Sequence, residues 1–364
     1  MTALAHTDPH PLGPRPLAAP GEAPDGSPDV VLGPEELAAV RALGTDVRAT
    51  LAWVAEVAAR FPLPGDGRTA GLWAALATVA AVDVGVARAL EPHLDALAIL
   101  AQVPGPVALD AVGVDGGSTW GVFAAEGPGA RLEATAADGA WSLTGTKPWC
   151  SLAADLSHAL VTAWTDDGRR LFAVDLRAPS AEPADGPWVA RGLAQVVSAS
   201  VRFDTAPAVP VGDAGWYLGR PGFAWGGIGV AACWWGGAVG LARTLWDALG
   251  RREPDQLALA HLGATDVALG AARAALAEAA TAVDDGLDGR DAALVARRVR
   301  AVVVDAVEEV QRRCAHALGP GPLTTDEEFA RRVADLGLYV RQHHAERDQA
   351  ALGRDLLAAG DRPW

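Results

Sequence analysis

The spacing of hydrophobic positions divides the chain into two helical regions that enclose a region of short alternating runs. Residues 34–102 are rich in Ala and Leu with helical periodicity, interrupted at residues 61–67 (FPLPGDG). Within this region, residues 71–102 are expected to form two helices that separate near Pro92, because proline breaks helical hydrogen bonding. The first 30 residues are rich in Pro, Gly and Ala and are expected to be a flexible tail.

The helical pattern returns after residue 213 and continues to the end of the chain. It predicts four long helices, at about residues 225–250, 255–284, 290–318 and 324–359. Thr324 and Glu327 have the spacing of a capping box, so the last helix is expected to begin there. The most apolar window, residues 222–242, is interrupted by Gly and Trp and does not approach the roughly 20 uncharged apolar residues of a membrane span. We expect it to be a helix buried among other helices.

Between these regions, residues 107–208 consist of short runs separated by Gly, Asp and Pro, which is typical of strands and turns. Residues 165–168 (TDDG) are expected to form a hairpin turn. Helices, then strands, then helices predict an α+β fold with a helical domain at residues 31–106 and a central antiparallel β-barrel-like domain at residues 107–212. Residues 213–364 are then expected to form a C-terminal four-helix bundle.

Composition and charge narrow the classes of function. Half of the 364 residues are hydrophobic, enough for a large core, and the formal net charge of −15 argues against a nucleic-acid partner. Cys150, Cys233 and Cys314 are widely spaced, which fits a reduced, cytoplasmic protein rather than a disulfide or zinc framework. The N-terminus lacks the pattern of a secretory signal, and no membrane association is expected.

The common cofactor and nucleophile motifs are incomplete in this sequence. The glycines of GGIGVA and GPGARL do not complete a dinucleotide-binding turn, and Lys147 lacks the glycines of a phosphate-binding loop. GGSTW does not complete a nucleophile elbow. His343 and His344 are adjacent and would point about 100° apart on a helix, so no metal site is expected.

The stretch WSLTGTKPWCS, residues 141–151, contains Lys147, the only lysine of the chain. With the preceding residues from Phe123, it resembles the central domain of the acyl-CoA dehydrogenases, in which a Thr-Glu-Pro strand end precedes Gly-x-Lys-x-Trp-Ile-Thr. Residues 188–211 are similar to that family's Leu-Gly-x-Arg-Gly segment and the strand after it. Residues 316–342 are similar to its Gln-x-Leu-Gly-Gly-x-Gly…Arg-Asp-Ala stretch. Three matches in the family's order cover the chain from about residue 34 onward.

The resemblance implies FAD as the cofactor, an acyl thioester or other small molecule as the substrate, and a homodimer or homotetramer. An apolar bundle helix that needs covering also favours an oligomer. Trp149 and Ser151 fall where the family's Trp and Thr lie against the flavin, and Ala125 and Glu126 match the Thr-Glu pair. Trp149 and Trp141 could instead fill the core of the strand region. Lys147 is expected to support the turn rather than to touch substrate.

A second group of residues is implied to meet the flavin diphosphate. His316 and Gly319 match the family's Gln…Gly stretch, and Arg251 or Arg252 could bind phosphate in the bidentate manner of arginine. A solvated helix end would explain the two arginines equally well.

The catalytic base is the main departure from the family. α,β-Desaturation of an acyl thioester needs a carboxylate that removes the α-proton. Arg341 occupies the usual position of this glutamate, and a guanidinium is no base near neutral pH. Some relatives carry the base on the first bundle helix, directly after an arginine, and Glu253 follows Arg252 in this way. Glu253 is therefore the candidate base, although an acidic residue on the surface at a helix end would give the same sequence.

Two alternatives to desaturation remain open. Relatives without the glutamate act as flavin-dependent monooxygenases, and the histidines near the C-terminus agree with such a reaction. Loss of chemistry on a retained fold is the other alternative, favoured by Arg341 and Ala125. The electron acceptor is not specified by the sequence.

Overall fold

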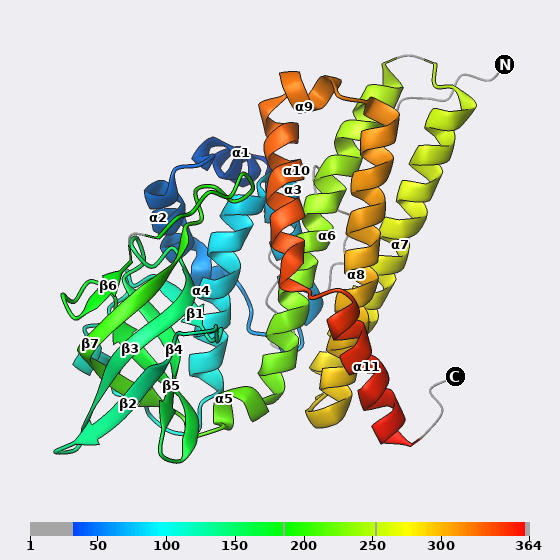
Figure 1. Ribbon diagram of the computed structural model, residues 1–364. Coiled ribbons are helices and arrows are strands. Elements are labelled where there is room, and N and C mark those ends of the chain that lie inside the picture. Colours follow the sequence, from blue (N-terminus) through cyan, green and yellow to red (C-terminus); the bar gives the residue numbers. More distant parts are fainter. Residues whose placement is uncertain (1–31, 185, 252, 361–364) are drawn as a thin grey trace.

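The computed structural model describes residues 32–184, 186–251 and 253–360. Four helices come first, then seven strands, and then helices again (Figure 1). The first helices are α1 (Pro34–Leu43), α2 (Val47–Val57), α3 (Thr69–Val82) and α4 (Val84–Gln102), with 3₁₀ turns at Ala58–Arg60 and Leu109–Val112. The expected order of helices, strands and helices is confirmed.

The helices near the N-terminus begin at aspartate caps. The Asp46 carboxylate accepts from the backbone N–H of Ala49, and the Asp83 carboxylate accepts from that of Val86, both at 3.0 Å. The second cap separates α3 from α4, so the predicted break near Pro92 is wrong. Pro92 lies inside the continuous helix α4.

The strands form one mixed sheet that closes on itself. They are β1 (Trp120–Phe123), β2 (Leu132–Ala137), β3 (Ala140–Ser151), β4 (His158–Thr165), β5 (Gly168–Asp175), β6 (Ala181–Pro183) and β7 (Ser198–Val211). The order is β1-β4-β2-β3-β7-β5, and β5 also pairs with β4, which gives a barrel-like ring. Most pairs are antiparallel as expected, including the hairpin at residues 165–168, but β1 and β2 pair with β4 in parallel.

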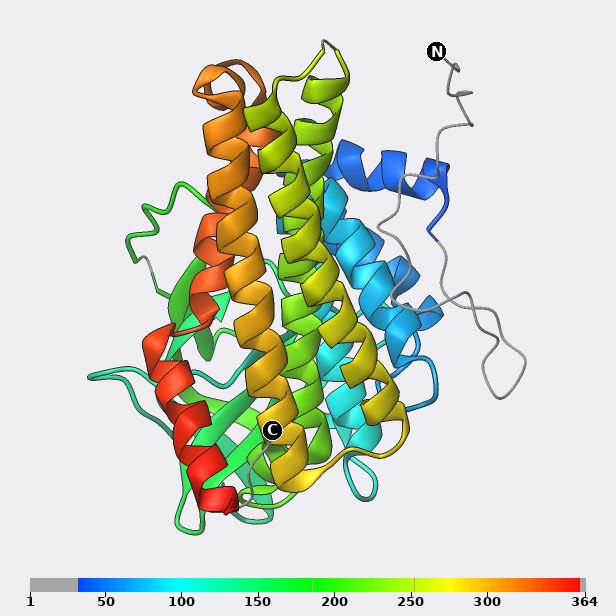
Figure 2. The ribbon, with the colours of Figure 1, turned by 90° about the vertical axis from the view of Figure 1, so that its right-hand side faces the viewer.

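The C-terminal part is helical, but its last long helix is broken. The helices are α5 (Trp216–Gly219), α6 (Pro221–Gly250), α7 (Gln256–Asp284), α8 (Gly289–Leu318), α9 (Gly321–Thr325), α10 (Glu327–Tyr339) and α11 (Glu346–Ala359). Figure 2 shows α6, α7 and α8 side by side. A turn at Val340–Gln342 and the positive φ of Ala345 separate α10 from α11. The predicted capping box is also wrong: Asp326 caps α10, and the Thr324 hydroxyl donates within α9.

Helix α6 is covered within the chain. Among the described residues it is the one helix long and apolar enough for a membrane span, and 72% of its most apolar window is buried inside the structure. Its glycines allow close packing: a Cβ on Gly236 would lie 2.1 Å from the carbonyl oxygen of Ala77 on α3. The apolarity of α6 therefore does not call for a second subunit, contrary to the expectation from sequence.

Two segments that are far apart in sequence meet beside α10. A Cβ on Gly192 would lie 1.9 Å from the carbonyl oxygen of Ala334, so only glycine fits there. The next residue, Leu193, donates its backbone N–H to the Asp335 carboxylate at 2.5 Å. This contact joins the strand region to the C-terminal helices.

Lys147 is inside the strand region, only 1% exposed. Its ammonium group lies 2.8 Å from both a carboxylate oxygen of Glu126 and the hydroxyl of Thr162. Lys147 therefore ties β3 to β4 and to the segment after β1, in agreement with the structural role expected for it.

We predict that Lys147→Met lowers the free energy of unfolding by about 2 kcal/mol, because it leaves the Glu126 carboxylate without its buried partner. The value is smaller than for a fully buried pair because the Glu126 side chain is 37% exposed. Urea denaturation measures the change. Arg202→Met, which removes an exposed cross-strand pair with Glu182, is the control and is expected to cost much less, because water screens an exposed pair. Equal losses in both variants would contradict the prediction.

Candidate functional site

A β-bulge in β3 directs Trp149 away from the strand core. Lys147 pairs with Val201 and Cys150 pairs with Ala199, so two residues of β3 lie opposite one residue of β7. Pro148 has no N–H for the ladder, which favours a bulge at this point. Trp149 takes the left-handed conformation with φ of 60°, and its side chain is 62% exposed. The alternative that Trp149 fills the core is thereby excluded.

Trp141 is partly buried and packs against the core. Its ring lies 5.3 Å from that of Phe172 and packs against the main hydrophobic cluster. The two tryptophans of the stretch thus have different roles, one inside the strand region and one at its surface.

Trp149 lines a cleft of about 240 Å³ between the strands and α4, which we call the outer cleft. One wall is formed by β1 with the two residues after it and by Trp149, Ser151 and Leu152 of the β3 end. The other wall is formed by Arg88, Glu91 and Asp95 of α4, with Tyr217, Val230 and Gln342 from the C-terminal helices. In Figure 1, α4 lies between the strands and α6.

Two hydrogen bonds fix α4 against the strands at this cleft. The Arg88 guanidinium donates to the Ser151 hydroxyl at 3.0 Å, and Ser151 shares a further bond of 2.7 Å with Ser198. On the next turn, Nδ1 of His93 accepts from the backbone N–H of Trp120 at 3.1 Å. Burial lowers the pKa of His93 to about 4, so this imidazole is neutral and can accept.

A second cavity, the inner cavity, continues from the outer cleft into the C-terminal helices. Its volume is about 370 Å³, and it shares Glu91, Asp95, Tyr217 and Val230 with the outer cleft. Its remaining lining combines apolar side chains with Arg220, Arg297, Arg300, His343 and Asp348. The Arg300 guanidinium donates to the carbonyl of Gly227 at 2.7 Å and lies 4.5 Å from the Trp234 ring.

Glu91 and Asp95 lie one turn apart on α4, where the two cavities meet. Neither residue was expected from the sequence to belong to the site. Their signal was an acidic pair at i, i+4 within an otherwise apolar stretch, because a helix brings such positions onto one face. Asp95 lies 3.5 Å from Arg220, whereas the Glu91 carboxyl makes no hydrogen bond or ion pair with residues 32–184, 186–251 or 253–360.

The predicted cofactor residues fall into two separate groups. Ala125, Trp149 and Ser151 line the outer cleft. Glu126 follows Ala125 but turns to Lys147, and its other carboxylate oxygen accepts from the Trp164 indole at 3.4 Å. Glu126 therefore supports the cleft wall and is not part of the cleft lining.

The second group lies at the other end of the long helices. Arg251 follows the last residue of α6, His316 is in the last turn of α8, and Gly319 ends α8. Arg252 lies outside the described residues. Arg251 is 21 residues beyond Val230 on the same helix, which corresponds to roughly 30 Å. This group does not meet the outer cleft of its own chain, and its proposed contact with a flavin diphosphate stays a prediction.

The structure does not support Glu253 as the base of this cleft. Glu253 is exposed in the turn between α6 and α7, beyond Arg251 and remote from the cleft of its own chain. Arg341, at the family's glutamate position, pairs with Glu308 of α8 on the surface. Its neighbours Gln342 and His343 line the outer cleft and the inner cavity instead.

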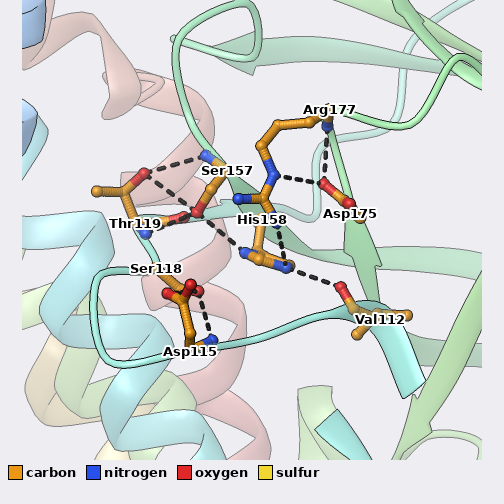
Figure 3. Close-up of polar contacts among 8 residues, drawn as sticks. All are labelled: Val112, Asp115, Ser118, Thr119, Ser157, His158, Asp175 and Arg177. Carbon is orange, nitrogen blue, oxygen red and sulfur yellow. Dashed lines mark hydrogen bonds and ion pairs between the residues drawn. The ribbon is translucent and has the colours of Figure 1, made fainter. Parts of the chain in front are cut away.

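A second polar cluster, around Ser157 and His158, has the residue types of a hydrolytic triad but another geometry (Figure 3). Nδ1 of His158 lies 2.9 Å from the Ser157 hydroxyl, while Nε2 lies 2.9 Å from the backbone carbonyl of Val112. Asp175 accepts from Arg177 rather than from the histidine. His158 is fully buried, so its ring has no access to substrate, and the cluster anchors the segment before β1 to β4.

Metal-ligand clusters are not found in the described part of the chain, where no group of three His, Cys, Asp or Glu side chains converges. The three cysteines are free and buried.

Comparison with solved structures identifies the fold. KijD3, solved in complex with FMN and a dTDP-linked amino keto sugar, matches with a TM-score of 0.75 at 22% identity over 90% of this chain and 92% of that one. Butyryl-CoA dehydrogenase from Megasphaera elsdenii matches with a TM-score of 0.70 at 19% identity, over 90% and 91%. Dibenzothiophene monooxygenase (TdsC) from Paenibacillus sp. A11-2 matches with a TM-score of 0.68 at 18% identity, over 90% and 98%.

No protein-family model matches the sequence, and no curated protein matches it. The structural matches show that the chain has the acyl-CoA dehydrogenase fold, as the resemblance implied.

We predict that Glu91→Gln stabilises the protein at alkaline pH. Burial, and then the charge of Asp95, raises the pKa of Glu91 from 4.5 to about 8. Between these values the native protein holds a proton that the unfolded chain has released, so the free energy of unfolding falls as the pH rises and the loss is complete above pH 8. Glutamine removes this loss, so the melting temperature of the variant should exceed that of the wild type by about 2 °C or more at pH 9.

The same difference should shrink toward pH 5, where both residues are neutral. Thermal denaturation followed by circular dichroism at pH 5, 7 and 9 provides the comparison. Glu56→Gln, at an exposed position of α2, is the matched control. A difference that is independent of pH would rule out a raised pKa.

Proposed function

We propose that this protein is a flavin-dependent oxidoreductase that holds the flavin ring in the outer cleft against Trp149. The observation that carries the proposal is the exposed indole, which the β3 bulge turns out of the strand core into a cleft. A flat, amphipathic ring system needs such an apolar face and a few polar groups at its edge. The structural neighbours support the proposal, since KijD3 was solved with FMN bound.

The polar residues of the outer cleft fit a flavin. The Ser151 hydroxyl and the Arg88 guanidinium, which are hydrogen-bonded to each other at 3.0 Å in the cleft lining, keep further N–H donors and oxygen lone pairs for heteroatoms at the ring edge. Ala124 and Ala125 are small, so the ring can approach the end of β1 closely. The resemblance favours FAD, whose diphosphate would meet Arg251, His316 and Gly319 of another subunit. FMN needs only the outer cleft.

The finer proposal is α,β-desaturation of an acyl thioester. A bound flavin supplies two-electron oxidation, and the protein must orient the acyl chain, exclude water and accept the α-proton. The inner cavity offers an apolar surface for the chain, formed by Phe223, Ala224, Val230 and Ala296. Neither Glu253 nor Arg341 lies where it could accept the proton.

Oxygen-dependent oxidation of a small molecule is the second candidate. It is favoured by the surface ion pair of Arg341 with Glu308, which leaves the cleft without the carboxylate of the dehydrogenases. Buried His343 and partly buried Arg300 make the inner cavity more polar than an acyl chain requires. TdsC, a monooxygenase, has the same fold.

We predict that the purified protein binds FAD or FMN and that Trp149→Ala weakens this binding at least about tenfold, because the ring loses its stacking surface. Fluorescence titration with each flavin gives the dissociation constants, and chromatography of released flavin identifies the native one. Trp246→Ala is the matched control, since Trp246 is 66% exposed on α6 and does not line the outer cleft. Equal affinity of the Trp149 variant and the wild type would refute the site.

Paired assays separate the two reactions. For desaturation we expect butyryl-CoA, or a longer acyl-CoA, to bleach the flavin absorbance anaerobically and to reduce an electron-acceptor dye. For oxygen-dependent oxidation we expect no bleaching by acyl-CoA, and instead oxygen consumption when a flavin reductase supplies reduced flavin. A colourless protein that binds neither flavin would support the third alternative, a fold that has lost its chemistry.

A further inference from the structure

Glu91 combines burial with access to three cavities around α4. Its side chain lines the outer cleft, the inner cavity and a small apolar cavity near Phe61 and Trp225. The residue is 8% exposed, and no residue of the described ranges hydrogen-bonds to its carboxyl group. Buried carboxyl groups are normally paired, so a carboxyl group that faces a cavity without a partner indicates a function.

The charged and titratable groups that act on Glu91 come from five helices: Arg88, Asp95, Tyr217, Cys233, Arg300 and Tyr339. The two cations among them are engaged elsewhere. Arg88 donates to Ser151 and stacks over Tyr339, and Arg300 donates to the carbonyl groups of Gly227 and Gln342. Burial therefore has the largest effect on Glu91, and Asp95 reinforces it.

Arg220 stabilises the charged form of Asp95. Its guanidinium lies 3.5 Å from the Asp95 carboxylate and is itself held by Gln102 at 2.6 Å. Two carboxyl groups one turn apart in a buried site do not both ionise readily, and the one with the arginine is the better anion. Glu91 is thus the member of the pair that holds a proton near neutral pH and releases it in mildly alkaline solution.

We propose that Glu91 is the proton acceptor of the flavin cleft, in place of the glutamate that the family carries at position 341. The carboxylate takes a proton from the substrate: an O–H bond forms at Glu91, a bond to hydrogen breaks in the substrate, and the electron pair of that bond remains with the substrate for oxidation by the flavin. Asp95 is a positioning residue, because its charge acts on Glu91. This inference rests on the proposed function.

The first test measures the carboxyl group directly and needs no flavin. In infrared spectra of the purified protein, the C=O stretch of a protonated carboxyl group should disappear with a midpoint near pH 8 in the wild type. This band should be missing in Glu91→Gln and retained in Glu56→Gln. In Asp95→Asn the midpoint should move to lower pH, because a neighbouring negative charge has been removed. A wild type without this titration would overturn the proposal.

The second test measures coupling to the flavin and needs no substrate. Added electrons on a flavin raise the proton affinity of a nearby carboxylate, so the midpoint potential of the bound flavin should change its slope with pH near pH 8. The potential is measured by reduction with dithionite against indicator dyes. Glu91→Gln should lose this change of slope. The same slope change in both proteins would show that Glu91 is remote from the ring.

The third test concerns the direction of proton transfer. If the assays above identify a substrate, the rate of flavin reduction should rise with pH up to about 8 and fall at least about 100-fold in Glu91→Gln. A rate that falls through pH 8 would make Glu91 a proton donor and overturn the proposal. Failure of the protein to bind any flavin would refute the proposed function, and the infrared titration would still decide the state of Glu91.

Discussion

The burial of α4 between two different layers is the constraint on which the site depends. One side of this helix packs against β1 and the other against α6, so each polar side chain on it must find a partner or face a cavity. Arg88 and His93 find theirs on the strands, and Asp95 finds Arg220. Glu91 is left facing the cavities. The chemistry proposed for the site depends on this contrast, in which Arg88, His93 and Asp95 have polar partners and Glu91 has none among the described residues.

The bulge in β3 is the complementary feature on the strand side. Pro148 interrupts the ladder between two well-paired residues, and the extra residue places an indole at the surface where a regular strand would have turned it inward or along the sheet. Lys147, directly before it, is anchored to Glu126 and Thr162, so the bulge has a rigid base. A surface aromatic held in this way loses little freedom when a flat ligand stacks on it.

The fold was largely predictable from sequence because its signals are local. Alternation and glycine spacing located the strands, and helical periodicity located α6, α7 and α8 within a few residues. The errors came where tertiary contacts outweigh local preference. Pro92 is accommodated inside α4, and α10 ends at Tyr339, where no glycine or proline follows directly in the sequence. Parallel pairing of β1 with β4 depends on residues almost forty positions apart.

The site was predictable only on its strand wall. Trp149, Ser151 and Ala125 lie in one continuous motif, so the resemblance could place them. The helix wall is assembled from α4, α6 and the turn after α10, whose spacing in sequence carries no signature. The prediction of Glu253 as the base depended on the arginine before it. A neighbour in sequence does not determine how far the end of a 30-residue helix lies from the cleft.

Moving the proton acceptor from the turn after α10 to α4 has a physical consequence for the reaction. A carboxylate on a loop can rotate toward solvent, whereas Glu91 is held within a helix that is packed on both sides, so its position is fixed before substrate enters. The cost is a carboxyl group that stays mostly protonated at neutral pH. Such a group suits a substrate proton that is itself only weakly acidic, because the match between the two proton affinities governs the transfer. Arg341 pairs with Glu308 of α8 on the surface instead, while the two residues after it, Gln342 and His343, line the cavities.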